Sequence, residues 1–271
     1  MSAADPLPPD FDAALRNTSS SRGIFGGRVI YFHEIGSTND VAALAAEQGE
    51  PDGTLVIAAA QTAGRGRLGR TWFSPPGAGL YVSTILRDPA VSRWLTLAGG
   101  VAVAEGIRHA TALPVQLKWP NDVVAVADGA FAARRKVAGI LAEASSGAEG
   151  LQYVVIGFGI NLRAGAFPPG LGDRATALEL ELGRPVDAAR VLVDVLTALN
   201  RAVCDVRRGA VADLLARWRA LAPSSMGAAI EWDTPDGIRR GTTAGLGADG
   251  ALLVRDAGGV ERIISGEVRW I

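Results

Sequence analysis

Residues 64–70 read GRGRLGR and place three arginines and three glycines within seven positions. Arginine presents a planar fork of N–H donors that suits carboxylates and phosphates. Glycine reaches unusual backbone conformations, but it costs entropy on ordering and is poor material for a scaffold. One interpretation is a basic lid that becomes ordered around an anion. A solvated surface turn and a contact for nucleic acid are the alternatives for this stretch alone.

Residues 118–122, KWPND, place a lysine, an indole ring, an amide and a carboxylate at a strand end that a proline terminates. A buried charge is costly without a partner, so Lys118, which follows the apolar Val115 and Leu117, should face an anion or solvent. A lysine that protects an edge strand is the structural alternative. That alternative leaves Asn121 and Asp122 unexplained, so we favour a functional site.

Residues 157–162, GFGINL, follow an apolar strand and resemble a dinucleotide-binding fingerprint. The match fails because Leu162 stands at the third glycine position and no helix follows. Residues 64–70 also lack the Lys-Ser/Thr ending of a P-loop. The glycines around Phe158 either allow a ligand to approach the backbone, with Asn161 offering an amide, or form a tight β-turn.

The remaining reactive residue types favour structural roles. His33 and His109 lie far apart and lack the carboxylate spacing of a zinc site. Cys204 is the single cysteine, has no obvious histidine partner and most simply fills apolar space. With no Gly-x-Ser-x-Gly motif, covalent catalysis has little support.

The hydrophobic pattern predicts the elements that must position these motifs. Residues 1–27 read as a loose leader with one short helix around 11–16. After Pro223, short apolar runs alternate with Asp-Gly and Gly-Gly turns, which is typical of a small all-β barrel. The side chains at 37–40 offer helix caps. We expect strands at 29–33, 54–60, 79–86, 115–119, 123–126, 136–144 and 152–156, helices at 41–48, 94–112, 188–207 and 211–221, and a hairpin connection at 128–135.

Composition argues against several classes of protein. The chain has 271 residues, which suits one large domain with a small companion, and its formal charge of -1 gives no global attraction to nucleic acid or anionic lipid. The start, MSAADPLPPDFD, lacks the basic and apolar regions of a signal peptide. Apolar stretches end before the roughly 20 residues of a membrane helix. We therefore expect a cytoplasmic protein that binds neither DNA nor membrane.

The motifs occur in the order seen in biotin protein ligases, which the sequence resembles from about Val29 to its C-terminus. The resemblance rests on residues 64–70, the WFSP that follows, KWPND, KVAGIL at 136–141 and GFGINL. It implies an α+β fold: a mixed, mostly antiparallel sheet with flanking helices, like class II aminoacyl-tRNA synthetases, and a C-terminal SH3-like β-barrel. The expected divisions are 1–27, 28–222 and 223–271, without the DNA-binding domain of the two-function members.

The resemblance also implies the reaction and its partners. Biotin and MgATP would give biotinyl-5'-adenylate and pyrophosphate, and a lysine of a biotin carboxyl carrier domain would then take the biotinyl group. Mg²⁺ would arrive on the ATP phosphates, with no side-chain cluster for it. A monomer or weak homodimer is expected. Because the adenylate is a mixed anhydride that water destroys, a basic loop that closes over it makes chemical sense.

Site residues follow from the resemblance, position by position. Because two anions must meet in the first step, cations must neutralise them, and Lys118, Arg65 and Arg67 are the expected catalytic residues. Lys118 would touch both the biotin carboxylate and the α-phosphate, and Trp72 would pack on adenine. The expected biotin site comprises Ser37, Thr38, Asn39, Gln61, Gly64, Arg65, Gly66, Arg67, Lys118, Trp119, Gly139, Ile140 and Leu141. The expected ATP and adenylate site comprises Arg70, Trp72, Asn121, Asp122, Lys136 and Asn161.

Two other functions stay open at this point. A lipoate ligase-like acyltransferase shares the general architecture, although the Gly-Arg-Gly-Arg loop favours biotin. A non-enzymatic nucleic-acid-binding protein would use residues 64–70 and the C-terminal barrel as contacts. The slightly acidic charge balance and the lack of clustered aromatic residues in the barrel argue against it.

Overall fold

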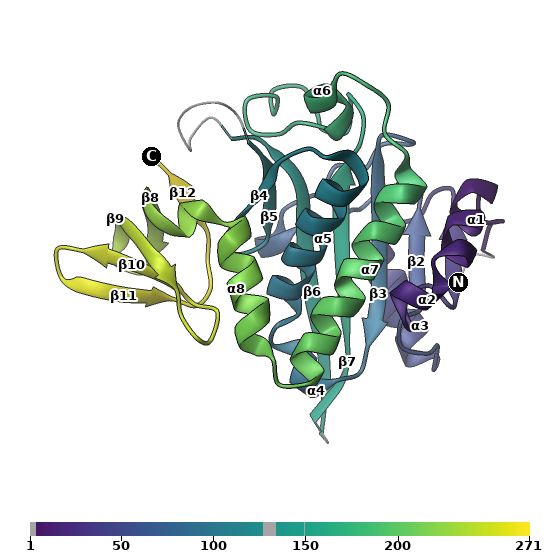
Figure 1. Ribbon diagram of the computed structural model, residues 1–271, viewed down its shortest axis with the longest axis horizontal. Coiled ribbons are helices and arrows are strands. Elements are labelled where there is room, and N and C mark those ends of the chain that lie inside the picture. Colours follow the sequence, from purple (N-terminus) through teal and green to yellow (C-terminus); the bar gives the residue numbers. More distant parts are fainter. Residues whose placement is uncertain (1–3, 127–133, 149) are drawn as a thin grey trace.

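A seven-stranded sheet forms the centre of the molecule in the computed structural model, which describes residues 4–126, 134–148 and 150–271. Its strand order is β1-β2-β3-β7-β6-β5-β4 (Figure 1). Only β1 and β2 pair in parallel, so the predicted mixed, mostly antiparallel sheet is confirmed. The strands are β1 (Val29–Phe32), β2 (Leu55–Ala58), β3 (Gly79–Leu86), β4 (Val115–Lys118), β5 (Asp122–Ala125), β6 (Lys136–Gly147) and β7 (Gly150–Asn161).

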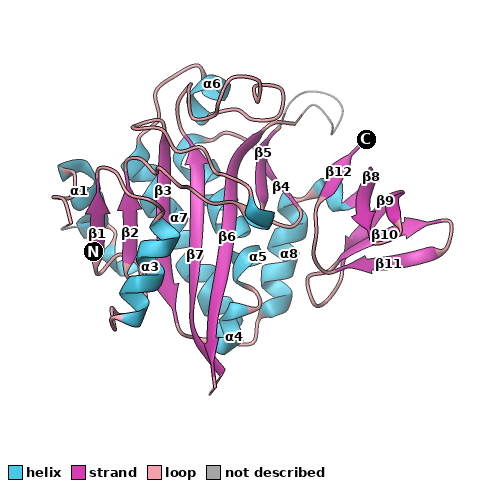
Figure 2. Ribbon diagram, turned by 180° about the vertical axis from the view of Figure 1, so that it is seen from behind, coloured by secondary structure: helices cyan, strands magenta, loops and turns pink. Residues whose placement is uncertain are grey.

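Helices cover both faces of this sheet. On one face lie α5 (Leu95–Thr111), α7 (Ala188–Arg207) and α8 (Val211–Leu221) (Figure 1). The opposite face carries α3 (Thr38–Glu47) (Figure 2). Short helices α4 (Pro89–Ser92) and α6 (Leu178–Leu182) complete the connections.

Two apolar layers follow from this arrangement. The larger lies between the sheet and α5, α7 and α8, and includes Ile57, Val82 and Ile156. The smaller lies under α3 and includes Val56 and Ile85. Because neighbouring strand residues point to opposite faces, the consecutive apolar residues of β2 and β3 supply both layers.

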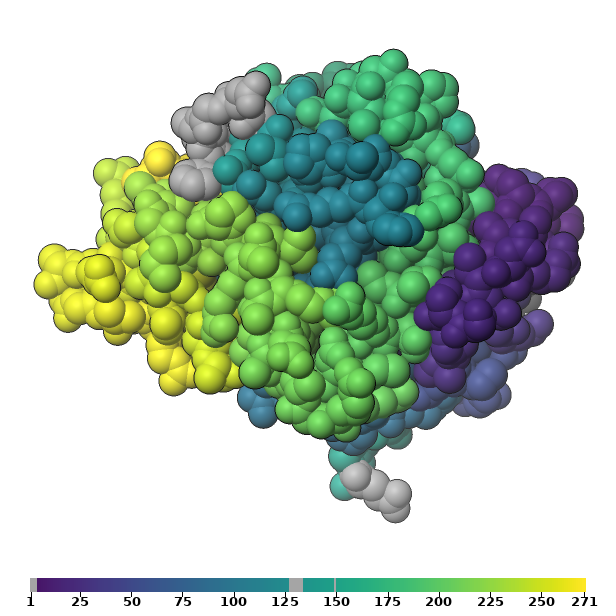
Figure 3. All heavy atoms as spheres, in the orientation of Figure 1, coloured from purple at the N-terminus to yellow at the C-terminus, as the bar shows by residue number. Residues whose placement is uncertain are grey.

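The N-terminal helices pack against the rest of the protein. Helices α1 (Pro9–Asn17) and α2 (Ser19–Arg22) pack along α7 (Figure 3). Leu15 and Phe25 are buried in the main core, and the buried Arg22 donates to the carbonyls of both residues. The prediction of a loose leader is therefore wrong over this part, because a few anchoring residues hold it without a periodic pattern.

The C-terminal part is a five-stranded antiparallel sheet with order β11-β10-β9-β8-β12. It follows the short 3-10 helix η3 (Pro223–Ser225), and its buried Ile230 and Val254 join the main core. This agrees with the expected SH3-like module, while the domain limits 28–222 and 223–271 stay a prediction. The strands are β8 (Met226–Thr234), β9 (Gly237–Leu246), β10 (Leu252–Asp256), β11 (Gly259–Ile263) and β12 (Val268–Trp270).

Most predicted elements are found with small shifts at their ends, and α7 and α8 match the predicted ranges. Two interpretations were wrong. Residues 157–161 continue β7, so they form no tight turn. Ser37 occupies the N-cap position of α3 without a side-chain cap hydrogen bond, because the polar side chains here serve a cavity instead. The predicted hairpin connection at 128–135 lies largely outside the described residues.

Candidate active site

One cavity of about 890 Å³ lies between the central sheet, residues 65–73 and the C-terminal sheet. Every residue assigned to the site from the sequence lines it, with the exception of Gly64. Gly64 lines a second cavity of about 730 Å³ on the other side of the arginine loop, defined here as residues 64–70. Its carbonyl accepts from the backbone N–H of Trp72 at 2.8 Å, so Gly64 closes the base of the loop.

A run of neutral polar side chains forms one end of the main cavity, called here the relay end. Gln61 Oε1 accepts from the backbone N–H of Thr38 at 2.8 Å and from its hydroxyl at 3.1 Å. Gln61 Nε2 donates to Ser74 Oγ at 2.8 Å. On the other side, Ser83 Oγ lies 2.8 Å from Thr38 Oγ1 and donates to Asn39 Oδ1 at 2.6 Å. The relay end of the cavity therefore offers prearranged neutral donors and acceptors.

Strand β7 carries a glycine at the point where these polar side chains approach it. A Cβ on Gly157 would lie 2.1 Å from Asn39 Oδ1 and 3.2 Å from Ser83 Oγ, so only glycine leaves room for the amide. This favours the sequence interpretation in which the glycines near Phe158 permit close approach, although the group that approaches Gly157 is a side chain of the chain itself. Asn39 is 5% exposed, so its amide must be satisfied inside the protein or by a ligand.

Glu143 of β6 borders the relay end, and the sequence analysis missed it. Its Oε2 accepts from Asn39 Nδ2 at 2.6 Å and from Arg65 Nη2 at 2.7 Å. Arg65 also pairs with Asp40 Oδ1 at 2.7 Å. The first arginine of the loop is thereby attached to α3 and to β6 at once. Only the tertiary structure reveals this contact, since Glu143 lies 78 residues from Arg65 in the sequence.

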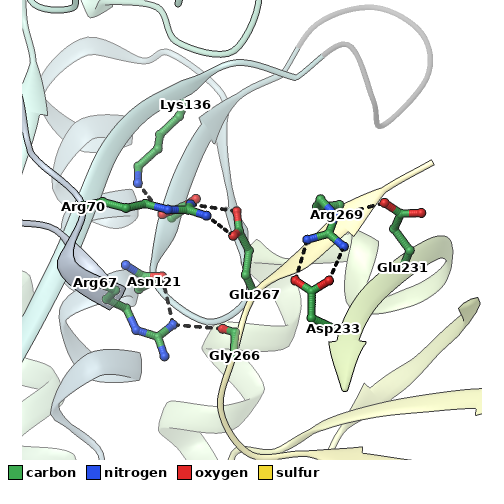
Figure 4. Close-up of polar contacts among 10 residues, drawn as sticks. Arg67, Arg70, Asn121, Lys136, Glu231, Asp233, Gly266, Glu267 and Arg269 are labelled. Atoms are coloured by element: carbon green, nitrogen blue, oxygen red, sulfur yellow. Dashed lines mark hydrogen bonds and ion pairs between the residues drawn. The ribbon is translucent and has the colours of Figure 1, made fainter. Parts of the chain in front are cut away.

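Positive charge gathers at the opposite end of the cavity, called here the cationic end (Figure 4). Lys136 Nζ lies 2.6 Å from Asp122 Oδ1. Arg67 Nη1 lies 3.4 Å from Asn121 Oδ1 and 3.3 Å from the carbonyl of Gly266. These residues come from β6, β5, the turn before β5 and the arginine loop, together with the segment before β12.

Glu267, in the segment before β12, holds the last arginine of the loop. Arg70 Nη1 donates to Glu267 Oε1 at 2.9 Å, and a second, shorter contact makes the pair bidentate (Figure 4). The hydrogen bond from Arg70 keeps the pKa of Glu267 below its usual range despite partial burial. The first arginine of the loop therefore pairs with Glu143 of the central sheet, and the last pairs with Glu267, just before the C-terminal strand β12.

Lys118 ends the edge strand β4, yet its side chain faces the cavity. Its ammonium lies 5.0 Å from the centroid of the Trp270 ring, and it makes no ion pair with a described carboxylate. Burial lowers the pKa of Lys118, while Asp122 and Glu267 counteract part of that effect. A partly desolvated cation against an aromatic ring is well placed to bind an anion. A lysine that only protected an edge strand from pairing would not need a partly buried side chain.

Trp72 lies across the floor of the cavity between its two ends. A Cβ on Gly159 would lie 2.3 Å from Trp72 Nε1, so the indole rests directly on β7. Lys136 Nζ lies 5.1 Å from the centroid of the ring. The indole Nε1 is buried and has no hydrogen-bond partner within the described ranges. The ring therefore presents a flat surface beside the cations, and its predicted packing on adenine stays a prediction.

The remaining predicted residues have mixed surroundings. Trp119 is buried and its Nε1 donates to the carbonyl of Gly250 at 3.1 Å, which joins the turn between β4 and β5 to the C-terminal sheet. Asn161 is 3% exposed and its Nδ2 donates to the carbonyl of Thr176 at 3.0 Å. Both line the cavity, as do Gly66 and the 139–141 segment.

The other features considered from the sequence lie elsewhere. His33 pairs with Asp5, and His109 pairs with Asp194, both on the surface. Within residues 4–126, 134–148 and 150–271, no group of three or more His, Cys, Asp or Glu side chains is arranged to hold a metal ion. Over the same ranges, no helix has the length and apolar character needed to cross a membrane.

The fold and the cavity together define a candidate enzyme domain, whose cavity has a neutral polar end and a cationic end. A family model described as the biotin/lipoate A/B protein ligase family matches residues 31–161. The bifunctional ligase/repressor BirA of Bacillus subtilis is 33% identical over 250 residues, which cover 90% of this chain and 74% of the relative. A biotin–[acetyl-CoA-carboxylase] ligase of Mycobacterium tuberculosis is 34% identical over 247 residues, covering 88% and 86%.

Solved structures agree with the sequence relatives. The biotin protein ligase from Aquifex aeolicus in complex with biotin and ATP superposes with a TM-score of 0.76 at 29% identity, covering 90% of this chain and 99% of that one. The chain therefore belongs to the biotin/lipoate A/B protein ligase family, and within it to the biotin protein ligases.

Proposed function

We propose that this enzyme joins biotin to ATP to make biotinyl-5'-adenylate and then transfers the biotinyl group to a lysine of a biotin carboxyl carrier domain. The observation that carries the proposal is the single cavity with two unlike ends. The relay end supplies matched partners for the ureido head of biotin, a group made of donors and acceptors. The cationic end supplies Arg67, Arg70, Lys118 and Lys136 for the carboxylate and the phosphates.

In the first step, a carboxylate oxygen of biotin attacks the α-phosphorus of ATP, and the bond from that phosphorus to the bridging oxygen of pyrophosphate breaks. The two reacting groups repel each other until cations neutralise them. Lys118 is proposed to contact both groups, because its ammonium is partly desolvated and has no carboxylate partner among the described residues. Arg67 and Arg70 would hold the phosphate side, with Arg70 exchanging Glu267 for pyrophosphate.

Mg²⁺ is proposed to enter bound to ATP. The acids nearest the cationic end are already engaged, Asp122 by Lys136 and Glu267 by Arg70. They therefore fit a role in orienting cations better than a role as a dedicated metal cage. The metal supplies further neutralisation of the phosphate charge when ATP binds.

In the second step, the uncharged amine of the acceptor lysine attacks the carbonyl carbon of the anhydride, AMP leaves, and the amine loses a proton. Until the carrier docks, water must be kept from the anhydride. The arginine loop is proposed to provide this cover, with Trp72 under the adenine. The single cysteine supports a cytoplasmic location, and a monomer or weak homodimer remains our prediction.

The relay end also bears on the lipoate alternative. The dithiolane ring of lipoate has no N–H or C=O group, so it could not pair with the second N–H of Asn39 Nδ2, the one that Glu143 does not use. A ligand that leaves a buried donor unpaired binds more weakly than one that supplies an acceptor. The polar lining of this end therefore favours biotin.

The proposal is tested by exchange of labelled pyrophosphate into ATP, with biotin and lipoate supplied separately, followed by transfer to a purified carrier domain. We expect biotin-dependent exchange, no exchange with lipoate, and labelling of one carrier lysine. Exchange with lipoate alone, or none with biotin, would refute the assignment. Filter binding of nucleic acid at physiological salt would identify the non-enzymatic alternative.

A further inference from the structure

We propose that Glu143 is a positioning residue that orients the Asn39 amide for recognition of the biotin head group. Glu143 lies on β6 at the border of the relay end, and its Oε2 accepts from Asn39 Nδ2 at 2.6 Å. The proposal rests on the proposed function, because it takes the ureido group of biotin as the ligand at this end. Glu143 acts on that ligand through Asn39, which lines the cavity.

The Asn39 amide has two possible orientations, related by a half turn of its side chain. The two ends of an Asn amide differ in kind, since the nitrogen donates and the oxygen accepts. The hydroxyl of Ser83 can do either, so it tolerates both orientations. A carboxylate can only accept, so Glu143 stabilises only the orientation with Nδ2 toward β6. Among the groups around Asn39, Glu143 is the one that selects the orientation.

This selection extends into the relay. With Nδ2 on Glu143, Asn39 Oδ1 must accept a hydrogen bond from Ser83 Oγ, which lies 2.6 Å away. Ser83 Oγ is also 2.8 Å from Thr38 Oγ1, so the orientation of one amide determines how the next hydroxyl is used. Asn39 Nδ2 keeps its second N–H for the cavity, where it can donate to a ligand oxygen.

The same carboxylate oxygen holds the arginine loop. Arg65 Nη2 lies 2.7 Å from Glu143 Oε2 and 2.7 Å from Asp40 Oδ1. Glu143 is thus shared between the Asn39 amide and the loop, whereas the side chain of Asp40 pairs only with Arg65 among the described residues. Asp40 is 56% exposed in its side chain and provides a matched control that removes one acid from Arg65 without touching Asn39.

The first test uses Glu143→Gln, which keeps the size of the side chain but presents either an oxygen or a nitrogen to Asn39. Calorimetry without ATP should show the Kd for biotin raised about ten-fold, on the scale of one hydrogen bond to a charged group. In pyrophosphate exchange, KM for biotin should rise by a similar factor, and kcat at saturating biotin should stay within about two-fold. Asp40→Asn should change the Kd less than about two-fold, as expected for an exposed ion pair.

The second test is a double-mutant cycle with Asn39→Ala. If Glu143 acts through the amide, then Glu143→Gln should cause no further loss of biotin affinity once the amide is gone. Ser83→Ala should weaken biotin binding less than Glu143→Gln, because Glu143 still selects the orientation. Melting temperatures close to wild type would show that the variants fold, and the partial exposure of Glu143 favours that outcome.

An unchanged Kd in Glu143→Gln, an equal loss in Asp40→Asn, or additive losses in the Asn39→Ala background would each overturn the proposal. A failure of the proposed function would give a different result: the wild-type protein itself would bind no biotin and would show no biotin-dependent exchange.

Discussion

The two ends of the cavity are built in opposite ways. The relay end consists of neutral side chains from α3, β3 and the segment after β2, all within the central sheet and its cover. The cationic end consists of charged groups that the arginine loop, the central sheet and the C-terminal sheet share. The first end is satisfied internally by hydrogen bonds, and the second by ion pairs that an anion can replace.

This difference indicates a division of labour. Neutral donors and acceptors held by a rigid sheet and helix suit ligand recognition, because they are hydrogen-bonded both before and after the ligand binds. Partly exposed ion pairs are individually weak, so an incoming phosphate can take over their cations at small cost. We therefore expect changes at the relay end to alter the affinity for biotin, and changes at the cationic end to alter the chemistry and the retention of the adenylate.

The largest effect is expected at Lys118. Lys118→Ala should slow biotin-dependent pyrophosphate exchange by roughly 10²- to 10³-fold, the cost of losing one preorganised electrostatic contact. The fold should be unaffected, which thermal unfolding can check, and Arg93→Ala, an exposed arginine outside the cavity, serves as the control. Near wild-type exchange in a folded Lys118→Ala protein would remove Lys118 from the mechanism.

A smaller effect is expected for Arg67, whose guanidinium reaches Asn121 and Gly266 across the cavity. Arg67→Gly should speed dissociation of biotinyl-adenylate by roughly 10- to 100-fold, because a charged contact to its phosphate is lost. Biotin binding should weaken less. The released adenylate should then label lysines of an unrelated bystander protein. Equal retention and no bystander labelling would show that the loop is a fixed turn.

At the relay end, Gly157→Ala should raise the Kd for biotin about ten-fold, because its Cβ would lie 2.1 Å from Asn39 Oδ1 and displace the amide. Exchange at saturating biotin should change little. Gly36→Ala is a matched control, since a Cβ there meets nothing within 4 Å. Titration of biotin against both variants checks the prediction. A Gly157→Ala protein with wild-type affinity would argue against the assigned role of Asn39.

The smallest effect concerns pH. Burial lowers the pKa of Lys118 from the ordinary 10.5, so its attraction for the biotin carboxylate is complete below the lowered pKa and is lost as pH rises through it. Biotin affinity should therefore fall over the pH range in which Lys118 loses its proton, which begins below that of an ordinary lysine. Lys118→Arg stays charged over that range and should show a flatter profile. Identical profiles for the two proteins would contradict this account.

The sequence predicted local features well and tertiary ones poorly. The long helices and most strands follow from periodicity, and the residues of the arginine loop and of KWPND were assigned to a shared site through the family resemblance. Glu143 and Glu267 were missed, because an acid in a strand or loop gives no local sign of its partner far along the chain. The short helix expected around 11–16 is found as α1, but the packing of the N-terminal segment against the core was missed for a related reason, since Leu15 and Phe25 are anchors without a repeating pattern.

The most direct test of the account is isolation of the intermediate. The wild-type protein is mixed with biotin and MgATP in the absence of a carrier, passed through a desalting column, and its bound small molecules are identified by mass spectrometry. The account predicts biotinyl-5'-adenylate that co-elutes with wild type and is nearly absent from Lys118→Ala, with no lipoyl-adenylate when lipoate replaces biotin. An equal amount of bound adenylate in Lys118→Ala would contradict the account. So would a wild-type protein that binds biotin but carries no adenylate.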